Sequence, residues 1–303
     1  MNWRAIEAVV RKDLKVVLQN KGVVIPLIVV PAIFMLLLPS LMALVPLFEE
    51  DLVSAMDEFQ MFLEGMPAGL QADLEDLDEG QTLVVLILIY FFAPLYLILP
   101  LMVASVIAAD SFAGEKERKT LEALLYTPTT DGELFLAKLL SAWLPALGVA
   151  WGGLILYAIV ANVAGWPTMG RIFFPNLMWV ILALWVAPAV AGVGLGTTVL
   201  ISVRAQGFQD AYQLGAIVVL PIVLLVIGQA TGVIYFSIWL ALLLGLVLWA
   251  ITGTLLSSIG PAFFEAGEHS IPLRLPAGTA GGIYMLSATS GEARETRLIL
   301  TVR

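Results

Sequence analysis

Long runs of apolar residues, separated by short polar segments, dominate the pattern of this chain. A helix needs about 20 apolar residues to cross the hydrocarbon core of a bilayer. Six runs are long enough to predict membrane spans: Val23–Leu47, Thr82–Ala109, Leu134–Ala161, Ile172–Val203, Ala211–Gly228 and Val233–Gly260. The fifth run is the shortest and is followed by a break, Gly228 to Gly232, so a re-entrant element is the alternative to a full crossing. We expect a crossing, and therefore an all-α membrane protein with six transmembrane helices.

The first 21 residues show a different pattern, in which apolar residues recur every three or four positions. The apolar face consists of Trp3, Ile6, Val10, Leu14 and Val17. Basic residues occupy another face: Arg4, Arg11 and Lys15. This pattern predicts an interfacial amphipathic helix on the inner membrane surface, ended by Asn20 and Gly22. Its role is open between a topology anchor and a contact with a partner.

Composition and charge support a membrane protein and set its orientation. Hydrophobic residues make up 60% of the chain and charged residues 13%, where soluble domains have roughly 45–50% and about 25%. With both termini in the cytoplasm, all the Lys and Arg residues except Arg171 lie on the cytoplasmic side, as the positive-inside rule requires. The segment 48–81 has eleven acidic residues and no basic one, which predicts an external loop. A helical stripe within it predicts a small cap: Leu52, Met56, Phe59 and Leu63.

Several functional classes are excluded by residues that the chain lacks. It has no cysteine and a single histidine, His269, so it has neither a thiolate nor a histidine cluster for zinc. No phosphate-binding loop of the GxxxxGK[ST] type is present, so any ATP must be bound by another chain. We place Lys138 at the cytoplasmic flank of the third span, and the spans then contain no ionisable residue, which argues against a proton-coupled transporter. We expect no catalytic residue, no metal site and no cofactor in this chain.

The segment 110–134 is the most informative part of the cytoplasmic side. Its string GEKERKTLEALLYTP, Gly114–Pro128, predicts a short amphipathic helix. Three leucines form the apolar face: Leu121, Leu124 and Leu125. Two ion pairs are expected at four-residue spacing: Glu115 with Lys119, and Arg118 with Glu122. Thr130 and Glu133 predict a capping box that begins the next helix. Such a helix suits the docking of a cytoplasmic partner, the alternative being a solvated loop.

This segment resembles the signature of the ABC-2 type transporter permeases, Glu-x-Glu-Arg-Gly-Thr-Leu-Glu-x-Leu-Leu-x-x-Pro, followed by a Leu and a Lys at the third span. The matching residues are Glu115, Glu117, Arg118, Thr120, Leu121, Glu122, Leu124, Leu125, Pro128, Leu134 and Lys138. Lys119 stands where the family has Gly. The N-terminal helix is similar to the connecting helix of the family, and six spans with both termini inside match its topology. The chain after Phe264 departs from the family pattern.

The resemblance implies the permease subunit of an ATP-binding cassette exporter in the cytoplasmic membrane of a prokaryote. Two permease chains, expected as a homodimer, would work with two copies of a separate ABC ATP-binding subunit that holds ATP and Mg. The residues that match in 115–128 would form a coupling helix on that subunit. The cargo would be amphipathic, lipid-like, a drug or an ion, and the wording of 114–122 favours the sodium-efflux and multidrug-type branches. A scaffold or sensor that recruits a cytoplasmic partner, and a channel, are the alternatives.

The expected organisation has three parts. Residues 1–21 form the interfacial helix, 22–261 form the six-span domain with the loops 48–81 and 110–134, and 262–303 form a cytoplasmic tail. Pro and Gly residues break any helix in the tail. Arg297–Arg303 could form a strand, but no partner for it is apparent, and we assign the tail no function.

Overall fold

The computed structural model describes residues 2–48, 68–118, 130–231, 234, 236–265, 282–290 and 293–301. The chain divides into two units, Met1–Ala266 and Gly267–Arg303. In the described part of the first unit every regular element is a helix, and six helical segments are long and apolar enough to span a membrane. The predicted all-α membrane fold with six spans is therefore confirmed.

The six spans coincide with the six apolar runs. They are Lys21–Pro46, Glu79–Glu117, Gly132–Met169, Leu177–Arg204, Phe208–Gln229 and Ile238–Ile259. Span 1 is built from α2 (Lys21–Ala32), η1 (Ile33–Leu37) and α3 (Leu38–Phe48). Span 2 is built from α6 (Glu79–Val85), η3 (Leu86–Phe91), α7 (Phe92–Tyr96), α8 (Ile98–Ala109), η4 (Asp110–Gly114) and α9 (Glu115–Glu117). Span 3 is α11 (Asp131–Met169). Spans 4 to 6 are built from α12 (Leu177–Ile181), η5 (Leu182–Val186), α13 (Ala187–Arg204); α14 (Phe208–Gly215), η6 (Ala216–Val219), α15 (Leu220–Ala230); and α16 (Ile238–Glu265).

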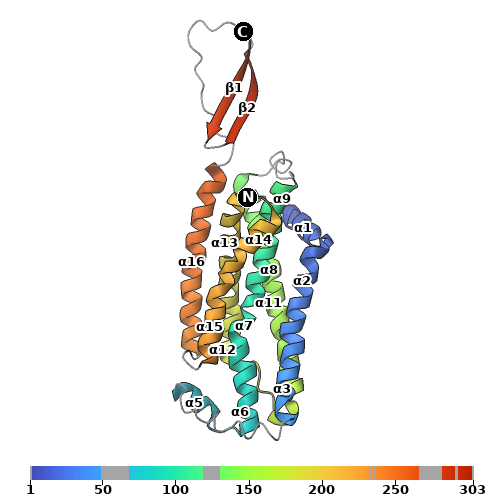
Figure 1. Ribbon diagram of the computed structural model, residues 1–303, viewed down its shortest axis with the longest axis vertical. Coiled ribbons are helices and arrows are strands. Elements are labelled where there is room, and N and C mark those ends of the chain that lie inside the picture. Colours follow the sequence, from blue (N-terminus) through green and yellow to red (C-terminus); the bar gives the residue numbers. More distant parts are fainter. Residues whose placement is uncertain are drawn as a thin grey trace. The chain divides into compact units, whose positions relative to one another are not determined.

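The fifth span, left open between a crossing and a re-entrant element, is a rod of 22 residues with a short 3₁₀ turn, η6, in its middle. It runs along the bundle from α14 to α15, in the orange part of the ribbon (Figure 1). Its length and composition are those of a full crossing.

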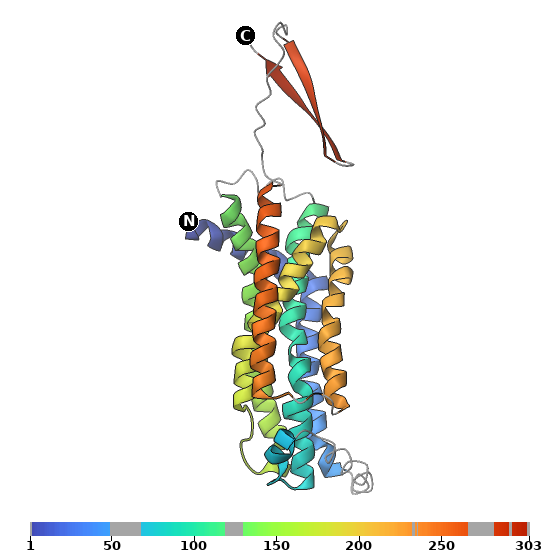
Figure 2. The ribbon, with the colours of Figure 1, turned by 90° about the vertical axis from the view of Figure 1, so that its left-hand side faces the viewer.

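Spans 2 and 4 form the centre of the bundle. Their most apolar stretches are 67% and 72% buried, whereas those of spans 1, 5 and 6 are 17% buried. Figure 1 shows α2 and α16 at opposite sides with α8 and α13 between them, and in Figure 2 α16 faces the viewer. The apolar surface of the outer helices is the surface that lipid or a second chain would cover.

Short π-helical turns interrupt spans 1, 2 and 4, and in spans 2 and 4 donors from neighbouring helices bond to the carbonyl groups of these turns. In η3, the Leu88 carbonyl accepts from Tyr157 Oη at 2.6 Å, and the Ile89 carbonyl accepts from Trp179 Nε1 at 2.8 Å. The rings of Tyr157 and Trp179 stack with centroids 5.0 Å apart. A π-helical turn leaves the regular hydrogen-bond ladder incomplete, and these side chains satisfy it inside an apolar core.

Helix α1 (Trp3–Gln19) begins and ends where the sequence indicates. Asn2 caps it, and Asn20 ends it and caps α2. Its buried face differs from the predicted stripe, because it consists of Ile6, Val9, Asp13 and Val17 while Trp3 is 63% exposed. Ile6 and Val9 pack against Leu134 and Ala137 of α11, so part of the apolar face is covered by protein.

The helical cap predicted in the external loop is only partly described. Helix α5 (Ala68–Leu74) lies in the acidic segment 48–81. The stripe Leu52, Met56, Phe59 and Leu63 lies outside the described residues.

The second unit contains a hairpin, and here the sequence interpretation was incomplete. Strand β1 (Gly282–Ser290) pairs antiparallel with β2 (Ala293–Thr301), with Gly282 opposite Thr301. A strand was expected at Arg297–Arg303, but the interpretation that it has no partner strand was wrong. The partner strand lies just before it, across a two-residue connection.

Candidate functional site

Six charged side chains gather where span 2 meets α1 and the start of α11. We call them the charge cluster: Lys12, Asp13, Asp110, Glu115, Arg118 and Lys138. Three are basic and three acidic, so their formal charges cancel. The cluster joins α1, the η4–α9 end of span 2 and α11, which are distant in sequence.

Glu115 is the central member of the charge cluster and is only 4% exposed. Its Oε1 lies 2.6 Å from Lys12 Nζ, and its Oε2 bonds to Lys138 Nζ. Lys138 is fully buried, and its Nζ also donates to the Ser111 carbonyl at 2.7 Å. A lysine is almost never buried to this extent unless its charge is paired. One carboxylate therefore ties α1 and α11 to the end of span 2.

Asp13 closes the network on the α1 side. Its Oδ1 lies 2.9 Å from Lys12 Nζ, and its Oδ2 accepts from Ser141 Oγ of α11 at 3.2 Å. Burial alone would lower the pKa of Lys12, but the hydrogen bonds and charges of Glu115 and Asp13 outweigh it and raise this pKa above its ordinary value. Lys12 is therefore charged at neutral pH.

Arg118 and Asp110 form a second pair along span 2. Arg118 Nη1 lies 3.0 Å from Asp110 Oδ1, and Arg118 Nη2 donates to the Asp110 carbonyl at 3.2 Å. Asp110 is 2% exposed. This pair spans the π-helical turn η4, so it stabilises an irregular part of the helix.

Lys116 and Glu117 link the same segment to spans 4 and 5. Lys116 Nζ donates to the Val203 and Ala205 carbonyls at the end of α13, at 3.3 and 3.0 Å. Glu117 Oε2 accepts from the backbone N–H of Phe208 at 3.0 Å, at the start of α14. A cation at a helix C-terminus and an anion at an N-terminus both complement the helix dipole. The segment 110–118 thus contacts four other helices.

The predicted coupling residues fall into three groups. Glu117 and Arg118 are exposed, whereas Glu115 is buried. The burial of Glu115 results from Lys12 and Lys138 on either side. The coupling role of all three residues stays a prediction. The remaining predicted coupling residues lie outside the described part of the chain: Thr120, Leu121, Glu122, Leu124, Leu125 and Pro128. Lys119 and Glu122, the expected ion-pair partners of Glu115 and Arg118, lie outside it as well. The predicted amphipathic helix Gly114–Pro128 is described only up to Glu117, where it continues span 2.

Other predicted residues of this region are described. The capping box of Thr130 and Glu133 is confirmed, with reciprocal hydrogen bonds of 3.3 and 3.2 Å at the start of α11. On α1 the residues named for the interfacial helix are all exposed: Trp3, Arg4, Arg11 and Lys15.

A comparison with protein-family models gives one match, described as the ABC-2 family transporter protein, over residues 7–259. That range covers most of the chain. The protein belongs to the ABC-2 transporter family. No curated protein and no solved structure matches the chain significantly. As an ABC-2 protein, the chain is a transmembrane subunit of an ABC transporter and not itself the ATPase, and such subunits usually work with an ABC ATPase subunit.

In this ABC-2 protein, the sequence interpretation missed that the charges near the membrane are paired with one another. Asp13 lies on the same face as Ile6 and Val17, and a carboxylate on an apolar stripe is a signal that could have been used. Asp110 directly follows an apolar run, and Lys138 lies within one. The expectation of spans without ionisable residues holds for the middle of the helices and is wrong at this end.

Proposed function

We propose that this chain is the permease of an ABC exporter, and that the loop 110–134 docks a separate ABC ATP-binding subunit through the segment Gly114–Pro128. In the working unit, two copies of the permease form a homodimer and two ATPase subunits hold ATP and Mg. The side with α1 and the charge cluster faces the cytoplasm. The preference for the sodium-efflux and multidrug-type branches rests only on the amino-acid sequence of residues 114–122 and stays a prediction.

The burial of Glu115 between Lys12 and Lys138 carries this proposal. On the two sides of the segment 119–129, the charge cluster joins α9 to α11 and to α1. Removing one partner of a buried ion pair destabilises a protein by about 3–5 kcal/mol. A push on the loop therefore moves the ends of spans 2 and 3 and α1 together, rather than pulling them apart.

The bonds of Lys116 and Glu117 extend the same movement to spans 4 and 5. The end of α13 and the start of α14 are attached to span 2 through side chains on a single turn. These contacts are exposed or only partly buried, and they are weaker than the buried ones. They allow α13 and α14 to move relative to span 2, whereas the pair of Glu115 and Lys138 keeps span 2 and α11 in one arrangement.

The docking part of the proposal predicts loss of assembly when the leucine patch is removed. Leu124→Ala combined with Leu125→Ala removes apolar contact area, and each buried leucine contributes about 1.5–3 kcal/mol. We expect the double variant to lose most of its co-purification with the ABC ATPase subunit that the wild-type chain binds. The measurement is the amount of ATPase retained on the tagged permease in detergent.

The matched control is Ile155→Ala with Ile159→Ala on α11, because both side chains are 64% and 59% exposed in the middle of span 3. It removes similar apolar area away from the loop and should leave co-purification unchanged. Equal retention of the ATPase by the leucine variant and the wild type would contradict docking at this loop and would favour the scaffold or sensor function.

A further inference from the structure

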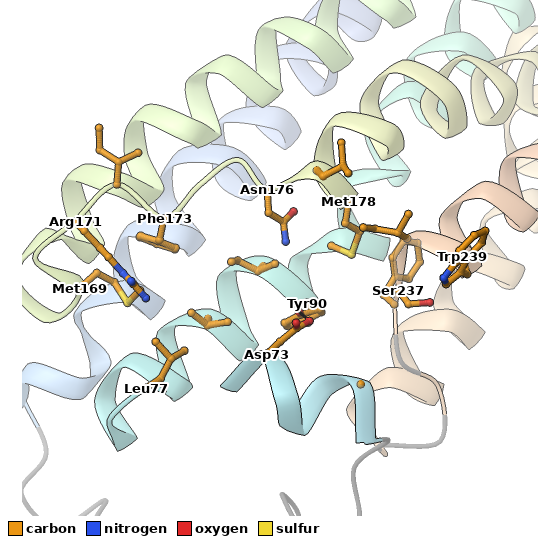
Figure 3. A pocket seen from close by; sticks show the side chains of 17 residues that line it. Asp73, Leu77, Tyr90, Met169, Arg171, Phe173, Asn176, Met178, Ser237 and Trp239 are labelled. Atoms are coloured by element: carbon orange, nitrogen blue, oxygen red, sulfur yellow. Dashed lines mark hydrogen bonds between the residues drawn. The ribbon is translucent and has the colours of Figure 1, made fainter. Parts of the chain in front are cut away.

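A pocket of about 670 Å³ lies at the end of the bundle opposite the charge cluster. Helix α5, span 2, the connection between spans 3 and 4, and the start of α16 form its walls. Figure 3 shows Arg171 and Met169 at one end, Tyr90, Asp73 and Asn176 in the middle, and Ser237 and Trp239 at the other end. A volume of this size accommodates a small molecule of several hundred daltons.

The polar groups of the pocket include one cation and one anion. Arg171 is exposed and forms no ion pair with the residues that the structure describes. Asp73 accepts a hydrogen bond from Tyr90 Oη at 2.8 Å. Asn176 uses its Oδ1 to cap α12 through the Trp179 N–H, at 3.1 Å, so its amide nitrogen is left as a donor that faces the space above Tyr90 (Figure 3).

Exposed apolar side chains line both ends of the pocket. Phe236 is buried in the wall, and Trp239 beside it is 80% exposed. Ile172, which follows Arg171 in the chain, is 76% exposed, and Leu177, which also lines the pocket, is 62% exposed. Large apolar side chains with such exposure on a membrane protein are suited to contact with hydrocarbon.

The charge around the pocket selects against a ligand with a net negative charge. Among the described residues, five acidic side chains lie between Ala68 and Gln81 at this end: Asp73, Glu75, Asp76, Asp78 and Glu79. Arg171 is the one basic residue that lines the pocket. The summed field of these carboxylates would repel an anion, whereas a zwitterion carries no net charge. A guanidinium binds a phosphate group through paired N–H donors, and an aromatic ring beside a carboxylate suits an ammonium group.

We propose that this pocket binds a zwitterionic amphiphile. Its phosphate-type anion lies on Arg171, its cationic group lies at Asp73 and Tyr90, and its hydrocarbon chain extends from the phosphate over Ile172. Within the proposed export function, this ligand is the cargo or a cargo analogue at the far end of the bundle. Binding is measured on the permease alone, so its failure leaves the docking proposal untouched, and loss of docking leaves the binding result untouched.

The test is titration calorimetry of the purified permease in a maltoside detergent with monomeric dihexanoylphosphatidylcholine. Dihexanoylphosphatidylglycerol, a net anion, and glycerophosphocholine, the zwitterionic head group without chains, are the comparison probes. We expect the wild type to prefer the phosphatidylcholine over both. Stronger binding of the phosphatidylglycerol would overturn the zwitterion assignment, and equal binding of glycerophosphocholine would overturn the amphiphile assignment.

Variants assign the binding to the pocket. Arg171→Gln should weaken phosphatidylcholine binding about tenfold, because it removes a charge-assisted hydrogen bond. Arg171→Lys keeps the charge and should retain more binding than Arg171→Gln. Asp73→Asn should narrow or reverse the preference over phosphatidylglycerol. The matched control is Arg204→Gln, an exposed arginine at the end of α13, which should bind as the wild type does. Unchanged affinity in Arg171→Gln would overturn the site.

Discussion

The two ends of the helix bundle differ in the pairing and burial of their charged side chains. At the α1 end, each member of the charge cluster has an oppositely charged partner within 3.0 Å, and four of the six are nearly buried. At the other end, Arg171 is exposed beside a pocket and lacks an ion pair among the described residues. Buried paired charges hold helices in one arrangement, whereas an exposed cation in a pocket is available to a ligand. The first end suits transmission of movement and the second suits binding.

The largest effect is expected from removing one partner of the buried pair. Glu115→Leu leaves Lys138 buried without a counter-charge, which should cost about 3–5 kcal/mol and lower the melting temperature strongly. Thermal unfolding of the purified chain in detergent measures it. The double variant Glu115→Leu with Lys138→Met replaces both charges by apolar groups and should recover much of the loss. A double variant no more stable than the single one would contradict the direct pairing.

A smaller effect is expected at Gly207, which precedes α14. A Cβ at this position would lie 2.5 Å from Glu117 Oε2, so Gly207→Ala should displace that carboxylate from the Phe208 N–H. The loss of a helix cap costs about 0.5–2 kcal/mol. The same thermal unfolding measures it, and Glu117→Gln combined with Gly207→Ala should add little further. Full additivity of the two substitutions would show that they act independently.

The charge cluster should also produce a dependence on alkaline pH. Because the pKa of Lys12 is raised in the folded chain above 10.5, its ordinary value, its stabilisation is fully present below that pH and is lost as the pH rises through the folded pKa. Lys12→Arg stays charged at higher pH and should shift the loss of thermal stability upward. An identical alkaline profile for both chains would contradict a charged Lys12 in the cluster.

The smallest effect on stability is expected at the pocket end. Arg171→Gln should change the free energy of unfolding by less than about 0.5 kcal/mol, as for an exposed side chain that has no ion pair with the described residues. Thermal unfolding without added lipid is the measurement. A loss comparable to that of Glu115→Leu would show that Arg171 is structural and would remove the difference between the two ends.

The fold was largely predictable because its signals are local. The length of each apolar run determines a span, and the capping box of Thr130 and Glu133 lies within four residues. The candidate site was less predictable because its contacts join distant parts of the chain. Lys12 and Glu115 are 103 residues apart, and Asp13 and Ser141 are 128 apart. The periodicity of α1 placed its basic face correctly, but not the fact that Asp13 faces α11. The pairing of β1 with β2 likewise depends on a register that one strand alone does not contain.

The central claim is that the charge cluster transmits movement of the ATPase to the spans, and a distance measurement tests it directly. The chain has no cysteine, so a single spin label can be attached at Glu79→Cys, an exposed position at the far end of span 2. Pulsed electron–electron double resonance then reports the distance between the two copies of the proposed homodimer, with and without vanadate-trapped nucleotide.

We predict a change of this distance on trapping in the otherwise wild-type permease. In Glu115→Leu with Lys138→Met the change should be lost while ATP hydrolysis continues. Glu7→Gln, which breaks only the exposed pair with Arg11 on the same α1 helix, is the control and should behave as the wild type. An unaltered distance change in the Glu115 and Lys138 variant would contradict transmission through the charge cluster.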